Sequence, residues 1–382
     1  MYPGAEIAAA LRGKPGQAVH DVSGTVLFAN RERSLFVPTS DPVHQARALD
    51  FFGASTIRRI AGTLQLGLQR WTRLEPTPAR LSLPTQWRER FDADLSAAAL
   101  YCGSPGPLQK LSLLLPSRAN AGLPRLVKVA LRSSADETIA REVRSLTSLA
   151  RLGAAVSRCV PELIEEGALP SGRRYLVTTA GNGQCGSATL TDEYLSFLHR
   201  LASATRTDVT WERGEALGRT RRVLRSLASD AIPPDIRRSL EDALGVTAQK
   251  LRGKHIPHTL MHGDFTRYNI CQGDRDFVVF DWEYSRAESN PIADVLHFGI
   301  SQRRVFNATR TLHSVLADAE RFAGLAFGGW HPTRHDLAAL ALHALVDTIV
   351  VYAAADGRLD TGSFIVRRHI GLIRSSRTWM SP

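Results

Sequence analysis

The chain has 382 residues, of which 43% are hydrophobic and 22% are charged. At about 100–200 residues per domain, this length predicts two or three structural units, and the ordinary composition excludes a chain that is disordered throughout. The four cysteines form no C-x-x-C pair. This excludes a zinc knuckle and a disulfide scaffold, and it favours a reducing, cytoplasmic compartment.

The formal net charge of +11 favours an anionic partner over a cationic one. Five of the 48 basic residues are lysines and the rest are arginines spread over the whole chain, a usage that often reflects genome composition. No platform of stacking aromatic residues and no reading helix accompanies the charge. Nucleic acid is therefore not the expected partner.

The longest apolar stretch, Leu337–Ala355, is long enough to span a membrane. It contains His343 and Asp347, and a charge near the centre of a lone span is costly. We therefore expect a buried helix and no transmembrane segment, and no export signal is expected at the start of the chain. The basic segment around Arg367 and Arg374 leaves a peripheral membrane contact as an alternative to a packed final helix.

Residues 1–93 are expected to form an N-terminal extension. Two short strands, Gly24–Ala29 and Ser34–Pro38, flank a polar turn, and a long helical pattern runs from Asp41 to about Trp71. The apolar side chains of this pattern predict that the extension packs on the lobe that follows. The stretch after it is expected to be a connector because it carries three prolines, Pro76, Pro78 and Pro84.

Residues 94–183 have the pattern of a small α+β lobe, the N-lobe. A strand or short helix at Leu95–Tyr101 and a turn at Cys102–Pro107 precede four strands, with one helix between the second and the third. The strands are expected at Gln109–Leu115, Arg125–Leu131, Glu162–Leu169 and Arg174–Thr179, and the helix at Asp136–Leu152.

Residues 184–382 are expected to form a mostly helical C-lobe. The predicted helices are 191–204, 213–229, 235–252, 291–303, 310–325, 335–355 and 361–376. Two short strands interrupt them, and each leads into a carboxylate. Thr259–Met261 precedes Asp264, and Asp276–Phe280 precedes Asp281.

The strongest signal for chemistry is the pattern H-G-D-x-x-x-x-N, which runs from His262 to Asn269, with Asp281 following at the end of an apolar run. Phosphoryl transfer from ATP needs a carboxylate that orients the acceptor hydroxyl and accepts its proton, and Asp264 fits this catalytic role. It also needs oxygen ligands for Mg²⁺, and Asn269 and Asp281 fit that role. Asp264 or Asn269 alone would be weak evidence, because both residue types often cap turns.

These motifs resemble the aminoglycoside phosphotransferase and choline kinase branch of the protein-kinase-like fold. The matching stretches are Leu260–Asn269, Phe280–Tyr284 and Asp294–Phe298, and the resemblance covers roughly residues 95–355. It implies an α+β, two-lobed fold with a small sheet-containing N-lobe and a mostly helical C-lobe, here with an N-terminal extension. Only twelve residues follow Asp281 before Asp294, which leaves no room for a long activation loop and indicates a small-molecule or glycan acceptor.

Lys128 lies in an apolar strand, at the position from which a kinase strand places an amine on the α- and β-phosphates. An apolar strand rarely carries a lysine without a partner. Glu142 on the following helix is the preferred partner, because the residues after it continue the apolar side of that helix. Glu137 is the alternative.

Two further segments are expected to contact the nucleotide. The turn residues Gly103, Ser104 and Gly106 stand where a phosphate-covering loop belongs, although the pattern lacks the full G-x-G-x-x-G and an ordinary hairpin turn is the alternative. In the family, the strand that enters the hinge between the lobes offers backbone groups to adenine. The candidates for that role are Val177, Thr178 and Thr179.

The sequence thus predicts an ATP- and Mg²⁺-dependent phosphotransferase that acts on an alcohol of a sugar, glycan, amino-alcohol or antibiotic. The basic charge favours an anionic or glycan acceptor over a polycationic aminoglycoside. The alternative is a non-catalytic, nucleotide-binding regulator of the pseudokinase type. Four intact residues argue against that alternative: Lys128, Asp264, Asn269 and Asp281.

Overall fold

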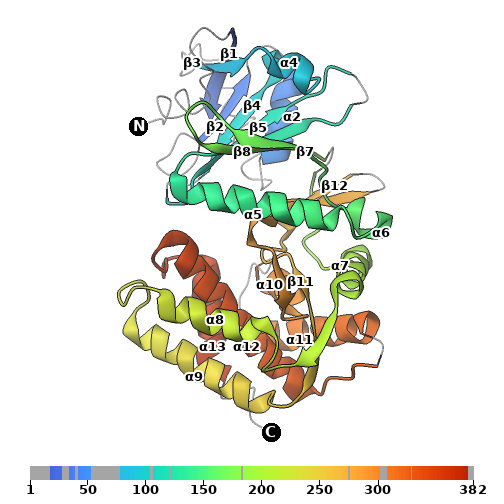
Figure 1. Cartoon of the computed structure of the whole chain (residues 1–382), viewed down its shortest axis with the longest axis vertical. Helices are drawn as coiled ribbons and strands as arrows, with labels where there is room; N and C mark the ends of the chain where they lie inside the picture. The colour runs from blue at the N-terminus through green and yellow to red at the C-terminus, as the bar shows by residue number, and fades with distance from the viewer. Residues whose placement is uncertain are drawn as a thin grey trace. The chain divides into compact units, whose positions relative to one another are not determined.

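The computed structural model describes residues 18–27, 34–38, 42–52, 78–103, 106–119, 122–181, 184–273, 276–301, 308–327 and 329–376. The chain forms two compact units (Figure 1). The first unit comprises Met1–Arg151, Ser157–Gly186 and Ile270–Glu283, and the second comprises Leu152–Val156, Ser187–Asn269 and Tyr284–Pro382. The chain therefore leaves the second unit at residue 270, contributes residues 270–283 to the first unit, and returns to the second unit at residue 284.

The first unit is built on an eight-stranded antiparallel sheet with the strand order β3-β1-β2-β4-β5-β6-β8-β7. The strands are β1 (Val19–Leu27), β2 (Ser34–Pro38), β3 (Pro78–Pro84), β4 (Ala99–Cys102), β5 (Lys110–Leu115), β6 (Arg125–Ala130), β7 (Leu163–Ala168) and β8 (Arg174–Thr179). Three of these strands come from residues 1–93. The N-terminal extension therefore continues the sheet, and β2 pairs directly with β4.

The segment Pro78–Pro84 is a strand, which corrects the expectation of a connector. It pairs along its whole length with β1 and lies at the edge of the sheet. Proline is tolerated in an edge strand, where one side of the strand donates to no neighbour, and its prolines stand at the two ends. Strand β1 is also longer than predicted, and the helical pattern of the extension is described only as α2 (Pro42–Phe52). Its expected continuation to Trp71 lies outside the described residues.

The sheet has a largely apolar face and a mixed face. Side chains of the apolar face form one core cluster that runs from the extension into the N-lobe, with Val22, Phe36, Leu83, Leu111 and Val127 among its members. Helix α5 (Ser133–Leu149) packs against β6, β7 and β8, as Figure 1 shows. A small sheet of β9 (Gln184–Cys185), β12 (Ile270–Gln272) and β13 (Phe277–Val279) completes this unit.

The second unit is mostly helical. Its helices are α7 (Asp192–Thr205), α8 (Glu215–Ser226), α9 (Pro234–Lys250), α10 (Ala293–Ser301), α11 (Ala308–Ala326), α12 (Arg334–Asp356) and α13 (Phe364–Arg374). Each lies within three residues of its predicted bounds. A small sheet of β10 (Thr207–Thr210), β11 (His255–Met261) and β14 (Arg286–Ser289) carries the catalytic motif, and the sequence reading missed its outer strands β10 and β14.

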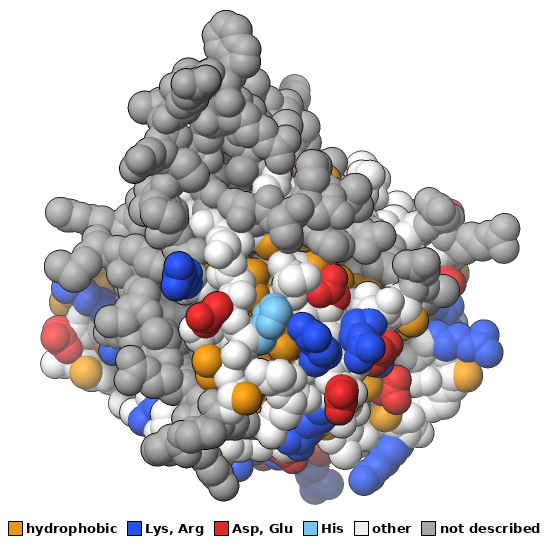
Figure 2. All heavy atoms as spheres, turned by 90° about the horizontal axis from the view of Figure 1, so that it is seen from above, with side chains coloured by type: hydrophobic (Ala, Val, Ile, Leu, Met, Phe, Trp, Pro, Cys, Tyr) orange, Lys and Arg blue, Asp and Glu red, His pale blue; other side chains and the backbone are white. Residues whose placement is uncertain are grey.

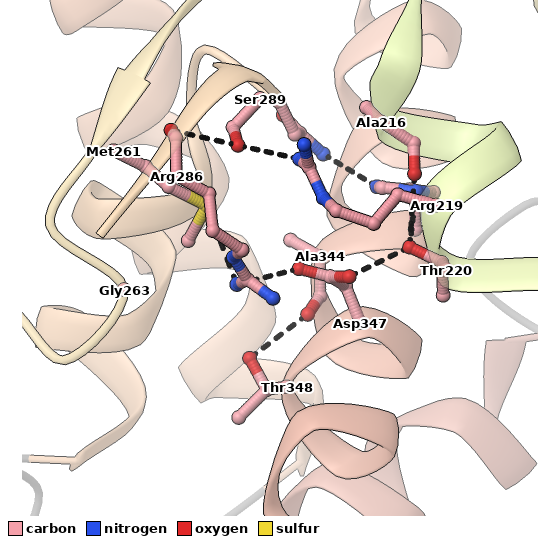
Figure 3. A network of polar contacts seen from close by, with 12 residues as sticks. Ala216, Arg219, Thr220, Met261, Gly263, Arg286, Ser289, Ala344, Asp347 and Thr348 are labelled. Carbon is pink, nitrogen blue, oxygen red and sulfur yellow. Dashed lines mark hydrogen bonds and ion pairs between the residues drawn. The ribbon is translucent and has the colours of Figure 1, made fainter. Parts of the chain in front are cut away.

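Helix α12 is long and apolar enough to cross a membrane, yet 78% of its most apolar stretch is buried inside the protein, so it is a core helix. The negative charge of Asp347, within this helix, is neutralised by a buried partner. Arg286 of β14 lies 2.8 Å from Asp347, and Thr220 of α8 donates a hydrogen bond of 2.6 Å to the same carboxylate (Figure 3). Burial works to raise the pKa of Asp347, but Arg286, His343 and Thr220 together outweigh it and hold the pKa below its ordinary value.

The basic residues are dispersed rather than gathered in one region. Several arginines form surface ion pairs, such as Arg222 with Glu215 and Arg374 with Asp235. Among the described residues of the face shown in Figure 2, basic side chains lie beside acidic and apolar ones. Exposed pairs of this kind contribute about 0–1 kcal/mol each, so they add little stability.

Candidate active site

The first unit holds a buried lysine with two carboxylate partners. Lys128 of β6 is 5% exposed. Its Nζ lies 2.7 and 2.8 Å from the two carboxylate oxygens of Glu142 on α5 and 2.8 Å from Oδ1 of Asp281. Burial works to lower the pKa of this lysine, but the two carboxylates raise it well above its ordinary value, so the ammonium stays charged.

The structure brings Lys128 to Glu142 and not to Glu137. Glu137 lies on the exposed side of α5, where it pairs with Arg144. Glu142 is 2% exposed and points toward the sheet, among buried apolar residues of the same helix. The apolar periodicity of α5 therefore selects the partner, as the sequence predicts.

A second buried pair lies beside the first. Lys110 of β5 pairs with the carboxylate of Glu283, and both side chains are largely buried. Burial works to lower the pKa of Lys110, but Glu283 and Asp281 raise it, while burial raises the pKa of Glu283. The sequence reading missed this pair. Lys110 is one of only five lysines, and Glu283 stands two residues after Asp281, so both carried a usable signal.

Asp281 follows β13 with a backbone φ of 70°. This is the left-handed region, which is sparsely populated by residues other than glycine and costs of the order of 1–3 kcal/mol. Aspartate and asparagine tolerate it better than most residues. The conformation turns the chain sharply just where the strand ends, with the Asp281 carboxylate held by Lys128.

The turn between β4 and β5 has ordinary hairpin features. The N–H of Gly103 donates to the carbonyl of Lys110, and the N–H of Gln109 donates to that of Gly106. A Cβ at Gly103 would meet its nearest atom at 3.6 Å, and one at Gly106 would meet nothing within 4 Å, so neither position requires glycine for space. Ser104 lies outside the described residues.

The backbone groups of β8 form hydrogen bonds within the sheet. Val177 and Thr178 are paired with β6 on one side and β7 on the other. The N–H of Thr179 donates to the carbonyl of Glu162, and the N–H of Ala180 donates to that of Pro124. In this conformation the N–H groups of Thr179 and Ala180 donate to carbonyl groups of the protein itself.

The second unit holds the loop of the H-G-D-x-x-x-x-N motif, and Asp264 is its central side chain. Nε2 of His297 on α10 lies 2.9 Å from Oδ1 of Asp264, and the amide nitrogen of Asn269 donates to Oδ2 at 2.8 Å. A carboxylate only accepts hydrogen bonds, so His297 is the donor. The Asp264 side chain is 26% exposed while His297 is 3% exposed. Both oxygens of this partly exposed carboxylate are thus held by hydrogen bonds from protein side chains.

The loop backbone is fixed by Asp294, at the start of α10. Its two oxygens accept the N–H groups of His262 and Gly263 at 2.7 and 2.9 Å. Gly263 has a φ of 86°, and a Cβ there would lie 2.4 Å from the carbonyl oxygen of Tyr284. Glycine is therefore required at this position. Phe265 anchors the other side of the loop, fully buried among aromatic rings of α7 and α10.

Asn269 has the chemistry of a metal ligand. Its side-chain nitrogen donates to both the carbonyl and the carboxylate of Asp264, at 2.8 Å each, which fixes the orientation of the amide and of its oxygen, an atom type that Mg²⁺ prefers. Among the described residues, no group of three or more histidine, cysteine or acidic side chains is placed to hold a metal ion. Mg²⁺ does not need one, because it is usually held by one or two protein oxygens together with substrate phosphates.

Comparison with known proteins agrees with this arrangement. Residues 117–340 match the model of the phosphotransferase enzyme family, which is more than half of the chain. No curated protein sequence matches the chain significantly. Among solved structures, aminoglycoside phosphotransferase APH(4)-Ia shares 14% identity over 78% of this chain and 98% of its own, with a TM-score of 0.51.

Two complexes of a thermostable mutant of that protein are similar as well. The one with ADP and hygromycin B covers 74% of this chain and 94% of its own, and the one with AMP-PNP and hygromycin B covers 73% and 93%. Both share 14% identity with this chain at a TM-score of 0.50. At this identity the likeness concerns the fold, and it confirms the predicted α+β, protein-kinase-like class.

The match over residues 117–340 assigns the chain: it belongs to the phosphotransferase enzyme family. The resemblance seen in the catalytic motifs is thereby confirmed, and the protein is an enzyme of the phosphotransferase class.

Proposed function

We propose that this enzyme transfers the γ-phosphoryl group of ATP to a hydroxyl of a small molecule or glycan, with Mg²⁺ as cofactor. One observation carries the proposal: Lys128, in an apolar strand, is held by both Glu142 and Asp281. A buried charged network of this kind contributes little net stability. A role of Lys128 in binding phosphates would explain why this buried network is present.

Asp264 supplies the base. The acceptor oxygen attacks the γ-phosphorus, the bond from that phosphorus to the bridging oxygen of ADP breaks, and the hydroxyl proton passes to Asp264. His297 and Asn269 hold the two carboxylate oxygens, so the base faces the acceptor in one orientation. Much of the rate gain of such a reaction comes from positioning of this kind.

Asn269 and Asp281 are proposed as the metal ligands. Both offer hard oxygen atoms, which Mg²⁺ prefers. An ion held by these two residues would supply positive charge to offset that of the transferring phosphoryl group. Lys128 then has two functions within the first unit: it orients the Asp281 carboxylate and offers an ammonium to the phosphates.

The turn around Gly103, Ser104 and Gly106 and the strand Val177–Thr179 stay proposals for phosphate and base contacts. The turn leads into β5, which begins at Lys110, and the N–H of Gly103 donates to the carbonyl of Lys110. The acceptor is proposed to be a small molecule, as in the complexes with hygromycin B. The dispersed basic charge keeps an anionic or glycan alcohol as the favoured class, and a soluble enzyme of the cytoplasm remains the expectation.

The test is an ATP-consumption screen against sugars, amino-alcohols and aminoglycosides, run with the wild type and with Asp281→Asn and Asp264→Asn. We expect turnover with one acceptor class in wild type and its near loss in both variants. If Asp281→Asn turns over within about threefold of wild type, equivalent to roughly 0.7 kcal/mol, its assigned role is wrong. Nucleotide binding without turnover for any acceptor would support the non-catalytic regulator.

A further inference from the structure

The mixed face of the first unit's sheet has a charged half and an apolar half. The register pairs Ser112 with Lys128 and Leu114 with Leu126. Because side chains alternate along a strand, Lys128 and Leu126 point to the same face. Lys110 shares this face, and it lies opposite Ala130. Lys128, the amine that the proposed function assigns to the phosphates, therefore stands directly beside the buried Leu114 and Leu126.

The apolar half is where the base of a bound nucleotide belongs. A purine is a flat, largely apolar ring joined to its phosphates by one sugar, so phosphates at Lys128 place the ring on adjacent apolar surface. Leu114, Leu126 and Ala180 form that surface as one cluster. Ala180 follows β8, the strand that the sequence assigns to base contacts.

This surface is already covered by the end of helix α2. Phe51 and Phe52, its last two residues, pack against the cluster of Leu114, Leu126 and Ala180. Phe51 also stacks on Phe280, with ring centroids 6.2 Å apart and planes inclined by 18°. Phe280 immediately precedes Asp281, one of the two carboxylates that hold Lys128. The ring of Phe51 therefore contacts both the apolar surface and the residue next to Asp281.

The helix is anchored elsewhere. Ala48 and Leu49 are buried against Leu35 and Val37 on β2 and Ala99 on β4. The side-chain amide of Gln45 donates to the carbonyl of Pro38 at 2.9 Å. The two phenylalanines are only partly buried. Phe52 also packs against this anchoring cluster and stacks on Tyr101, with ring centroids 5.6 Å apart. Phe51 does not belong to the anchoring cluster, so its ring can leave the apolar surface while the first part of α2 stays docked.

We propose that α2 is an autoinhibitory segment: Phe51 and Phe52 occupy the surface that the nucleotide base needs, and nucleotide binds when these rings leave it. The proposal rests on the proposed function, since it takes Lys128 as the phosphate site. It also gives the N-terminal extension a role, and it agrees with the sheet-bonded N–H groups of Thr179 and Ala180, which leave apolar contact as the main attraction for a base.

The competing view is that Phe51 is a permanent wall of the base site. The two views predict opposite signs. If the rings compete with the base, removing them raises nucleotide affinity, because apparent affinity falls in proportion to the share of molecules that are open. If they are a wall, removing them lowers affinity, because base stacking is lost.

The experiment measures the Kd of Mg²⁺–ADP by calorimetry for the full chain and for the double variant Phe51→Ala/Phe52→Ala. We expect binding about tenfold tighter in the double variant, which corresponds to a closed form about ten times as populated as the open one. The control is Phe364→Ala, which removes an exposed phenylalanine from α13 in the second unit and leaves Kd unchanged. Equal or weaker binding by the double variant overturns the proposal.

Hydrogen exchange on the wild type covers the case in which the double variant does not fold. Adding Mg²⁺–ADP is expected to increase exchange at the amides of the last turn of α2, around Leu49–Phe52. Unchanged or slower exchange there overturns autoinhibition. The proposed function fails separately: it fails if neither the wild type nor the Phe variant binds Mg²⁺–ADP, or if Lys128→Ala in the Phe variant leaves the affinity unchanged.

Discussion

His297 is the residue that the sequence motifs do not reveal and the geometry does. It lies on α10, three residues after Asp294, and its Nε2 is 2.9 Å from the Asp264 carboxylate. Its Nδ1 is buried without a hydrogen-bond partner among the described residues. A hydrogen on Nδ1 would have no acceptor there, so the tautomer that carries its hydrogen on Nε2 fits this environment best.

His297→Ala is expected to lower kcat while the KM for ATP stays nearly constant, because only the orientation of Asp264 is lost. A hydrogen bond to a charged group contributes about 1.5–3 kcal/mol, which corresponds to roughly 10- to 100-fold in kcat. His297→Gln keeps a donor nitrogen and should recover part of the loss. The measurement is steady-state kinetics with the acceptor found in the screen.

The matched control is His369→Ala, a buried histidine whose ring lies 6.1 Å from that of His297. It should reduce thermal stability to a similar degree and leave kcat within a few-fold of wild type. Equal kcat losses in the two alanine variants would mean that His297 acts only through packing.

Lys110 and Glu283 form a pair whose energetics can be tested directly. Removing one partner of a buried ion pair strands the other charge and costs about 3–5 kcal/mol, whereas removing both costs far less. We therefore expect Lys110→Met and Glu283→Gln each to lower the free energy of unfolding in urea, and the double variant to be more stable than the sum predicts. Strictly additive losses would show that the two side chains do not interact in solution.

At the scale of elements, the N-terminal extension is part of the sheet. Strand β2 pairs with β1 and β4, so it joins the extension to the N-lobe, and Phe36 on β2 is 1% exposed within the large core cluster. Gly24 faces this ring across the β1–β2 pair, where a Cβ would lie 2.2 Å from the Phe36 ring. Glycine at this point lets the ring lie flat across the neighbouring strand.

Phe36→Ala is expected to destabilise the whole first unit by about 3–5 kcal/mol, the usual cost of truncating a buried phenylalanine. Chemical denaturation followed by tryptophan fluorescence measures it, since Trp87 belongs to the same cluster. Val19→Ala, at a side chain that is 50% exposed on β1, is the control and should cost little. A loss below about 1 kcal/mol for Phe36→Ala would show that the extension folds as an independent module.

At the scale of the whole molecule, buried histidines link stability to pH. Burial lowers the pKa of His343 to about 4, and burial with the nearby His297 lowers that of His369 to about 3. Both are neutral in the folded chain. The unfolded chain protonates them below the ordinary value of 6.5, so it binds more protons there, and folding stability falls as pH decreases through 6.5.

Denaturation at pH 7.5 and at pH 5.5 should therefore show lower stability at the acidic pH. Each histidine contributes up to about 1.4 kcal/mol per pH unit to the slope. His369→Gln removes one of these groups and should flatten the slope by a comparable amount, whatever it does to stability at pH 7.5. A slope that is unchanged in this variant would mean that His369 is protonated in the folded protein.

The sequence by itself determined the elements and the linear motifs. Most described helices of the C-lobe follow from apolar periodicity, and α12 follows from the length of its apolar stretch. Lys128, Asp264, Asn269 and Asp281 follow from residue type and spacing, because these are local properties. The partner of Lys128 also follows, since the apolar side of α5 identifies Glu142 as the inward residue.

Only the tertiary structure decided which distant residues share a surface. Strand pairing turned the proline-rich stretch into β3, because an edge strand tolerates prolines that a sequence window interprets as a break. The turn into α10 brought His297 to Asp264, and sheet register set Lys110 beside Lys128. The packing of α2 onto the apolar half of the sheet is likewise set by contacts between segments far apart in the chain. Long-range contacts of this kind depend on register and chain reversal, and no local pattern encodes them.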